Sequence, residues 1–467
     1  MSTKIRCMFT VPTLQVGQVG GFIPAEEWGW AKSEKDVIEE MESVKAELKK
    51  IEERFGNELE FEGYDLIHNE QDILEKSFEI QNSDVDGILV FGCAITIPYT
   101  HAFLTYNKPL IIFAKEYSDP FYGSNLENGF LSWKFIYQKR PKSWLSIVID
   151  DFDWLYEKLN AIHALTNLKK TKILCFGPVH QLIGGEPLGM GSYAFIRKAQ
   201  EKLGIRIKFT SLDEVIDEFE KTPADEEVQN IYEKFLKEAY KKEANDDEAI
   251  RSIRFYKLLK KYIEKEDANA ITVNCFQSDL IDRLNAAPCF ALARLNDEKI
   301  VSACEADPNA LINMLMVSKA AHKPVFMGDP VFNERVPKII NAHCLCASKL
   351  EGYDKPHCPY CASFHHESGK SLSQQTLWKL GEKITATILS PDLNSMIIIK
   401  GEITNSDIGH YPICNTQVEF SIDDVEKLWN VCGSNIPFIG HMINVMGDYS
   451  NEIAELCKLA NIEPIIV

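Results

Sequence analysis

Two acidic residues, Glu305 and Asp329, closely follow apolar segments and carry side chains that can bind a divalent metal or transfer protons. Residues 300–304 are mostly apolar and end at Glu305, and the apolar residues 324–327 end just before Gly328 and Asp329. In an open parallel sheet, ligands bind in the crevice outside the carboxyl ends of the strands. If both segments are strands of such a sheet, the two carboxylates face the same crevice.

The segment between the two acids has the signals of a helix. Asp307 fits an N-cap, because its carboxylate can accept hydrogen bonds from free backbone N–H groups, and Pro308 is favourable at the first helical position. Residues at helical spacing then form one face to be buried: Ala310, Leu311, Met314, Leu315 and Ser318. The sequence therefore predicts a βαβ unit over residues 299–330, with an acid at each strand exit and Asp307 as a cap.

A histidine would complete a metal site with these acids. A hard divalent ion such as Mn²⁺ prefers carboxylate oxygens and tolerates an imidazole, so two acids and one histidine with open positions form a catalytic shell. His441 has the most favourable local sequence, because Gly440 precedes it and a strand-like segment follows. His343 and His366 lie in a polar segment and are expected to hold substrate hydroxyl groups. The full set of candidates is His343, His365, His366, His410 and His441.

The cysteines indicate a rival interpretation of the same region. Cys344-x-Cys346 and Cys358-x-x-Cys361 are spaced so that four thiolates can surround a structural zinc ion. Cys344 beside His343 is also an arrangement for a nucleophile and its base, although no residue that would orient the histidine is evident. A zinc site and a hydrolase therefore remain alternatives.

A glycine-rich stretch offers a third kind of site. Gly189 and Gly191 begin a match to the dinucleotide-binding pattern, and Asp213 lies near the position of a ribose-binding acid. That pattern needs its first glycine in the turn directly after a strand, whereas the preceding predicted strand ends at Gly177. A nicotinamide-dependent oxidoreductase is therefore the weaker alternative, and a crevice loop is the simpler interpretation.

The chain of 467 residues is too long for one hydrophobic core, so two or three domains are expected. Its formal charge of −19 argues against nucleic acid or an anionic membrane as partner, because both are bound by clustered Lys and Arg, and favours a small molecule. Neither a secretory leader nor an apolar run long enough to cross a bilayer is evident, and the 13 scattered cysteines suit a reducing compartment. We therefore expect a cytoplasmic protein.

The order of strand-like and helix-like segments predicts an α/β fold with two parallel-sheet domains followed by a β-rich C-terminal domain. The first α/β domain is residues 1–168, and one amphipathic helix over residues 150–170 leads into the next. The second α/β domain is residues 169–380, where the strand alternation resumes with AITVNCF and CFALARL before the two carboxylates. Residues 381–467 contain short strands such as KITATILS and SMIIIKGEI and form the third domain.

Several segments from about residue 270 to the end resemble the L-fucose isomerase and L-arabinose isomerase superfamily, especially its fucose isomerase-like members. They are NAAPCFALARLND, VSACEADPNALINMLM, KPVFMGDP, NAHCLCASKLEGYD, HHESG and GHMINVMGDYSNEIAELCKLANIE. The resemblance implies two α/β domains and a β-rich C-terminal domain, and an aldose–ketose isomerase that uses Mn²⁺ and an enediolate of the sugar. It also implies homo-oligomers, trimers or hexamers, in which Gln15 or Trp28 of one subunit can reach a neighbour's site.

The resemblance also implies roles for individual residues. Glu305 and Asp329 are the carboxylate ligands and the proton-transfer pair, and His441 is the imidazole ligand. His343 and His366 line the sugar site. The alternative from another class is a non-catalytic sugar-binding or regulatory protein on the same fold, since a fold does not determine function. Convergence of both carboxylates and His441 at metal-bonding distance distinguishes the enzyme from the binding protein.

Overall fold

The computed structural model describes residues 2–11, 31–93, 108–115, 145–179, 192–276, 278–406, 411–434 and 440–467. The chain divides into two compact units, one of residues 1–167 with 458–461 and the other of residues 168–457 with 462–467. Among the described residues, no helix combines the length and the apolarity needed to cross a membrane.

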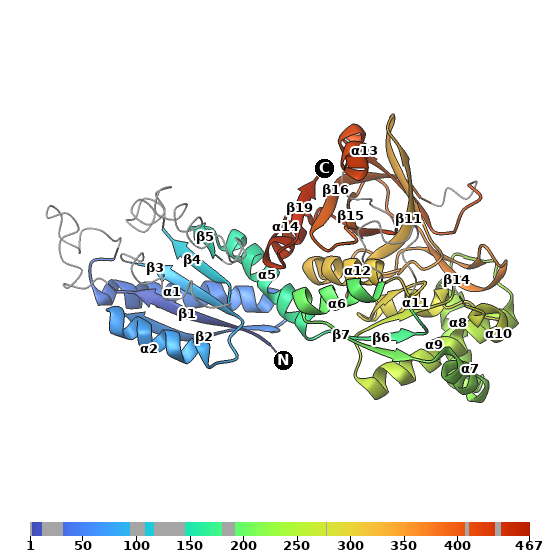
Figure 1. The fold of residues 1–467 in the computed structure, drawn as a ribbon, viewed down its shortest axis with the longest axis horizontal. Helices are drawn as coiled ribbons and strands as arrows, with labels where there is room; N and C mark the ends of the chain where they lie inside the picture. Colours follow the sequence, from blue (N-terminus) through green and yellow to red (C-terminus); the bar gives the residue numbers. More distant parts are fainter. Residues whose placement is uncertain are drawn as a thin grey trace. The chain divides into compact units, whose positions relative to one another are not determined.

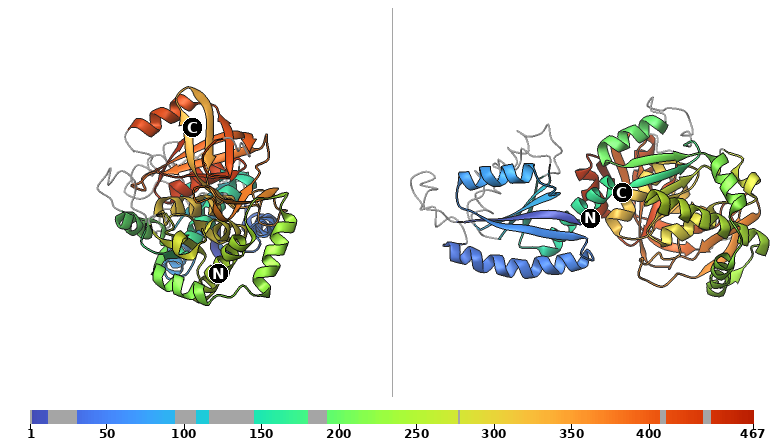
Figure 2. Two further views of the ribbon diagram at one scale, coloured as in Figure 1. Left: turned by 90° about the vertical axis from the view of Figure 1, so that its right-hand side faces the viewer. Right: turned by 90° about the horizontal axis from the view of Figure 1, so that it is seen from below.

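The first unit is an open parallel sheet with helices on both faces, as the alternating sequence pattern predicts. Its five strands lie in the order β2-β1-β3-β4-β5, and every pair of neighbours is parallel. Figure 2 shows α1 and α2 on opposite faces of this sheet. The strands are β1 (Thr3–Thr10), β2 (Leu59–Ile67), β3 (Gly87–Gly92), β4 (Leu110–Ala114) and β5 (Leu145–Ile149), and the helices are α1 (Glu34–Arg54), α2 (Glu70–Gln81) and α5 (Phe152–Lys169).

The second unit contains a smaller parallel sheet in the order β10-β9-β6-β7. Figure 1 labels two of its strands, β6 and β7. Its strands are β6 (Lys172–Phe176), β7 (Arg206–Thr210), β9 (Ala270–Val273) and β10 (Val301–Ala303). The helices of this region are α6 (Ser192–Leu203), α7 (Leu212–Lys221), α8 (Glu226–Glu238), α9 (Asp246–Glu266), α10 (Leu280–Leu284) and α11 (Cys289–Asp297). The expectation of a strand at CFALARL is therefore wrong, since the good helix formers Ala, Leu and Arg of this segment form α11.

A closed antiparallel barrel makes up the β-rich part of the second unit. Its strands follow the order β15-β18-β11-β12-β17-β16, and the pairing of β15 with β16 closes it. They are β11 (Phe326–Asn333), β12 (Val336–Ala342), β15 (Lys383–Leu389), β16 (Ser395–Ser406), β17 (Gln417–Ile422) and β18 (Met442–Met446). Strand β19 (Glu463–Ile466) pairs in parallel with β16. The helices of this part of the chain are α13 (Val425–Ser434) and α14 (Ser450–Leu459). A separate three-stranded sheet consists of β13 (Tyr360–His365), β14 (Lys370–Thr376) and β8 (Lys241–Lys242).

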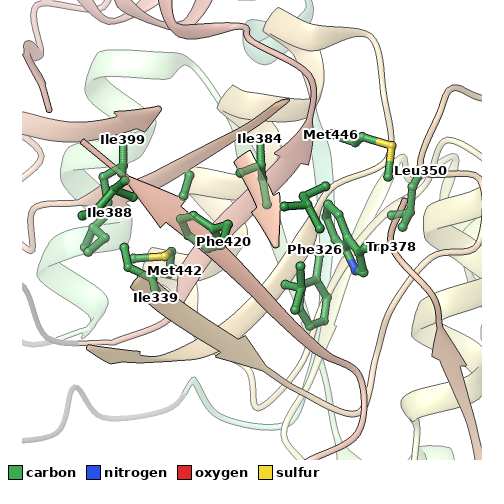
Figure 3. Packing of buried hydrophobic residues seen from close by; sticks show 14 of the residues in the cluster. Phe326, Ile339, Leu350, Trp378, Ile384, Ile388, Ile399, Phe420, Met442 and Met446 are labelled. Atoms are coloured by element: carbon green, nitrogen blue, oxygen red, sulfur yellow. The ribbon is translucent and has the colours of Figure 1, made fainter. Parts of the chain in front are cut away.

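Inward-facing aliphatic and aromatic side chains fill the core of the barrel (Figure 3). Phe326 of β11 packs near Trp378, with ring centroids 5.9 Å apart. Other buried members are Ile339, Ile384, Ile399, Phe420 and Met442, which come from five different strands. Because these strands span residues 326–446, the barrel holds together segments that are distant in sequence.

The expected βαβ unit over residues 299–330 is wrong in one respect. Strand β10 belongs to the parallel sheet, whereas β11 pairs antiparallel with β12 and β18 in the barrel. The helix between them, α12 (Pro308–Ala321), therefore connects two different sheets. The sequence pattern of strand, helix and strand was correct, but the pattern alone does not say which strands pair.

Helix α12 is buried on nearly all sides, not on the single predicted face. It contacts both β10 of the parallel sheet and β15 and β18 of the barrel. Two buried asparagines anchor it to the barrel: Asn309 Nδ2 donates to the Leu389 carbonyl at 3.1 Å, and Asn313 Nδ2 donates to the Thr387 carbonyl at 3.2 Å. The Thr387 hydroxyl donates to Asn313 Oδ1 at 2.8 Å, so the polar groups of Asn313 are paired inside the protein.

We expect Asn313→Ala to lower the free energy of unfolding of the second unit by about 1–3 kcal/mol, because it removes the acceptor of the buried Thr387 hydroxyl and the amide donor to the Thr387 carbonyl. Urea denaturation followed by far-UV circular dichroism measures this loss. Asn430→Ala, at an exposed position of α13, is the control and should stay within about 0.5 kcal/mol of the parent. Equal stability of the two variants would contradict the anchoring role of Asn313.

Candidate functional site

Glu305 lies in the turn that follows β10, and its backbone is strained. The φ angles of Glu305 and Ala306 are 62° and 52°, in the left-handed region that disfavours side chains by roughly 1–2 kcal/mol per residue. The Asp307 N–H donates to the Cys304 carbonyl at 3.2 Å, which closes the turn. Two successive non-glycine residues in this region are typical of positions where the surrounding structure enforces a functional geometry.

Asp307 has two roles, of which the sequence predicted one. Its Oδ1 accepts hydrogen bonds from the backbone N–H groups of Asn309 and Ala310 at the start of α12, which confirms the predicted N-cap. Its Oδ2 lies 2.8 Å from Nδ1 of His441, a residue 134 positions later in the chain. Because Asp307 and His441 are both buried, this hydrogen bond fixes the orientation of the imidazole ring.

His441 directs its other nitrogen toward both predicted carboxylates. Nε2 lies 3.8 Å from Glu305 Oε2 and 3.6 Å from Asp329 Oδ1. The His441 side chain is 7% exposed, whereas that of Asp329 is 64% exposed. The site therefore extends from the protein interior at His441 to the solvent at Asp329. A Cβ atom at Gly328 would lie 2.8 Å from the Asn341 side chain, and this close approach explains the glycine before Asp329.

His343, which directly follows β12, faces the opposite oxygen of Glu305. Its Nε2 lies 3.4 Å from Glu305 Oε1, and its ring centroid lies 5.4 Å from that of His441. The backbone N–H of Cys344 donates to His343 Nδ1 at 2.9 Å. A neutral imidazole that accepts at Nδ1 carries its proton on Nε2, so His343 is prepared to donate a hydrogen bond there.

The two histidines therefore have opposite tautomers when neutral. The Asp307 carboxylate requires a proton on Nδ1 of His441, which leaves the lone pair of Nε2 free to bind a metal. The Cys344 backbone N–H has the opposite effect on His343. It donates to Nδ1, so the ring proton lies on Nε2 and this nitrogen is a donor. Glu305, His343 and His441 offer ligand atoms within 4.8 Å of one another, but the hydrogen bonds favour His441 as the imidazole ligand.

The electrostatics favour ionised carboxylates around His441. Burial by itself raises the pKa of Glu305, but hydrogen bonds from His343 and His441 hold this pKa well below its usual range. Burial lowers the pKa of His441, whereas the Asp307 and Glu305 carboxylates raise it to about 10. The same negative groups that stabilise a proton on Nε2 would stabilise a divalent cation in its place.

The donor set fits a hard divalent cation. Neighbouring ligands of an octahedral ion with bonds of about 2.1 Å lie roughly 3 Å apart. The distances from His441 Nε2 to the two carboxylates exceed this by less than an ångström. Asp307 then acts as the outer partner that orients the ligand histidine, an arrangement common in metal sites.

His366, the other predicted residue of the sugar site, directly follows β13 and is half-buried, and its neighbour His365 interacts electrostatically with both His343 and Glu305. His365, not His366, lies near a second group of ligand atoms, with Cys289 and Cys344. The four cysteines of the zinc hypothesis have different surroundings: Cys346 and Cys358 belong to the barrel core, Cys344 packs with Cys289, and Cys361 hydrogen-bonds Glu243.

Asp213 is the residue of the nicotinamide hypothesis that lies in the described part of the chain. Asp213, the expected ribose-binding acid, forms an exposed ion pair with Arg283 at 2.6 Å. The residues Gln15, Trp28, Gly189, Gly191 and His410 lie outside the described part of the chain. The partnership of Asp307 with His441 was missed, because no local sequence signal connects residues so far apart.

Comparison with known proteins finds relatives that share one name. A sulfoquinovose isomerase from Priestia aryabhattai is 24% identical over 315 residues, which cover 66% of this chain and 67% of the relative. A sulfoquinovose isomerase from Priestia megaterium matches with the same values. A third, from Clostridium sp. (strain MSTE9), is 32% identical over 93 residues, which cover 20% of this chain and 21% of the relative.

Two further comparisons are less informative. No protein-family model matches the chain. Among solved structures, one match is the crystal structure of a protein assigned as a LacI transcriptional regulator from Bacteroides fragilis, with 10% identity, coverage of 69% of this chain and 93% of that one, and a TM-score of 0.18. Because the TM-score is so low, this match supports no conclusion about fold or function.

We expect Asp307→Asn to weaken divalent-cation binding by about 10–100-fold while the protein stays folded. Asparagine still caps α12, but its amide no longer provides the carboxylate that orients His441. Titration with Mn²⁺, followed by electron paramagnetic resonance of the free ion, measures the affinity. Asp424→Asn, an exposed N-cap aspartate of α13, is the matched control, and unchanged affinity in Asp307→Asn would rule out the orienting role.

Proposed function

We propose that this isomerase interconverts an aldose and the corresponding ketose, with Glu305, Asp329 and His441 as its metal-binding residues and the two carboxylates as its proton-transfer pair. The shared name of the relatives supports an isomerase that acts on a sugar. The single structural observation that carries the proposal is the approach of His441 Nε2 to both carboxylates, at 3.8 Å and 3.6 Å.

The cation and the two carboxylates are proposed to have different roles in the reaction. When bound, a divalent cation such as Mn²⁺ would polarise the sugar carbonyl and the adjacent hydroxyl. It would thereby make the C–H bond at C2, next to the carbonyl, more acidic. In the forward direction one carboxylate removes the proton from C2, which gives an enediolate of the sugar, and a proton is then delivered to C1. The hydroxyl proton moves from O2 to O1, so the reaction has no net gain or loss of protons.

His343 and His366 are proposed to contact the substrate. The Nε2–H of His343 is held beside Glu305 by the Cys344 backbone and can donate to a sugar oxygen that enters the site. His366 lies in the turn between β13 and β14 and is half-exposed, so its ring is available to a ligand. Neither residue needs to bind the metal in this arrangement.

The substrate is proposed to be a monosaccharide aldose, and sulfoquinovose is the first to test because the relatives carry its name. The chain is proposed to work in the cytoplasm, as its sequence features lead us to expect, and as a homo-oligomer, as its resemblance to known isomerases implies. The alternative of a non-catalytic sugar-binding protein is less favoured. Binding a sugar requires neither the strained backbone at Glu305 nor the approach of the Glu305 and Asp329 carboxylates to His441.

We expect Glu305→Gln and Asp329→Asn each to abolish isomerisation, because each removes a metal ligand and a member of the proton-transfer pair. A screen of aldoses, including sulfoquinovose, with added Mn²⁺ and detection of ketose identifies the substrate for this assay. Glu334→Gln alters an exposed carboxylate in the turn between β11 and β12 and should keep the parent rate. Near-normal turnover by either site variant would rule out the assignment.

The two histidines should fail in different ways when each is replaced by glutamine. His441→Gln is expected to lose cation binding, since it removes the imidazole that, among the described residues of the site, has its Nε2 lone pair directed toward the carboxylates. His343→Gln should retain the cation and lower kcat/KM through weaker contacts with substrate, by about 10-fold or more. Loss of the cation from His343→Gln with retention in His441→Gln would reverse the tautomer assignment.

A further inference from the structure

A second group of ligand atoms lies beside His343 and has a different chemical character. The thiols of Cys289 and Cys344 and a ring nitrogen of His365 all lie within 4.8 Å of one another. The two cysteines are 2% and 1% exposed, and His365 is half-buried. The three residues come from the first position of α11, the segment after β12 and the last position of β13.

A third thiol lies next to this group. Cys344 makes side-chain hydrogen bonds to both Cys289 and Cys414, so two thiols lie beside the Cys344 sulfur atom. Cys414 is half-buried and packs against Cys289, Cys344 and Ala287. The group of three cysteines and one histidine is a donor set that zinc prefers in structural sites.

The surroundings of these ligands also suit a bound metal. The backbone N–H of His366 hydrogen-bonds the Cys344 sulfur, a contact that stabilises a thiolate. The Ser368 hydroxyl lies 2.9 Å from Nδ1 of His365, and the Ser368 backbone N–H donates to the same nitrogen at 3.3 Å. Zinc binding through Nε2 therefore requires the ring proton to lie on Nδ1, where the Ser368 hydroxyl oxygen can accept its hydrogen bond.

We propose that Cys289, Cys344, His365 and Cys414 bind one zinc ion, as a structural site separate from the Glu305–His441 site. Binding converts three thiols to thiolates and releases three protons to solvent. Ligands of tetrahedral zinc lie roughly 3.8 Å apart, so shifts of about an ångström would bring Cys289, Cys344 and His365 to ideal geometry. Cys414 lies outside this group of mutually close ligand atoms and has to move further to complete the site.

The consequence for the neighbouring site is positional. Cys344 is adjacent to His343, and its backbone N–H is the group that sets the His343 tautomer. A zinc ion at Cys344 fixes this peptide relative to α11 and β13. The soft thiolates select zinc, whereas the carboxylates near His441 select a hard ion, so the two sites discriminate between metals by ligand chemistry.

Metal analysis of the full chain tests the proposal. The purified protein is stripped with a chelator, reconstituted with Zn²⁺, passed through a desalting column and analysed by mass spectrometry of the elements. We expect about one zinc per chain in the parent, in Glu305→Gln and in the matched control Cys346→Ser, a buried cysteine of the barrel core. Zinc retention should fall at least 10-fold in Cys289→Ser and Cys344→Ser, and parent-level retention in both would overturn the site.

Cobalt substitution of the unmodified protein gives a test that does not depend on how the variants fold. Co²⁺ bound by thiolates gives a sulfur-to-metal charge-transfer band in the near ultraviolet, which Co²⁺ on carboxylates and histidine lacks. We expect the band in the parent and in Glu305→Gln, and its loss in His365→Ala to be partial. Tight Co²⁺ binding by the parent without this band would contradict the zinc site while leaving the proposed isomerase untouched.

Discussion

The hydrogen bond between Asp307 and His441 is the interaction on which the site depends. One carboxylate oxygen caps helix α12, and the other holds the imidazole of a barrel strand. The helix start is thus tied to the beginning of β18, across two sheets that do not pair with each other. Both side chains are buried, so the charge of Asp307 is compensated by the histidine and by two backbone N–H groups, as a buried carboxylate requires.

Helix α12 transmits this constraint to the rest of the unit. It lies between the parallel sheet and the barrel and is buried on nearly all sides, and its asparagines use their amides to bond the backbone of β15. The strained turn at Glu305 and Ala306 precedes it directly. The energy stored in that turn is offset by the burial of the helix, and the turn keeps Glu305 directed toward His343 and His441.

The region beyond the strand ends contains two ligand sets of contrasting hardness. Carboxylates with one free imidazole nitrogen face the solvent through Asp329, whereas thiols and His365 lie next to them around Cys344. His343 lies between the two sets, with its Nδ1 on the Cys344 backbone and its Nε2 on Glu305. The hydrogen bonds of His343 therefore depend on how firmly the cluster of thiols around Cys344 holds the Cys344 backbone in place.

The sequence by itself determined the local elements and most of the chemistry. Alternating strands and helices predicted the parallel sheets, Asp307-Pro308 predicted the start of α12, and residue type identified Glu305, Asp329 and His441 as possible ligands. These inferences depend on interactions within a few residues, such as capping and the periodicity of buried side chains. They do not contain information on which strands pair.

Only the tertiary structure decided how distant residues meet. The closure of the barrel placed β11 beside β18 and so brought Asp329 to His441, although the predicted βαβ unit had assigned β11 to the parallel sheet. It also placed Cys346 and Cys358 of the alternative zinc motif in the barrel core and grouped Cys344 with Cys289 and His365 instead. Strand pairing depends on packing summed over the whole chain, and spacing along the sequence therefore cannot specify it.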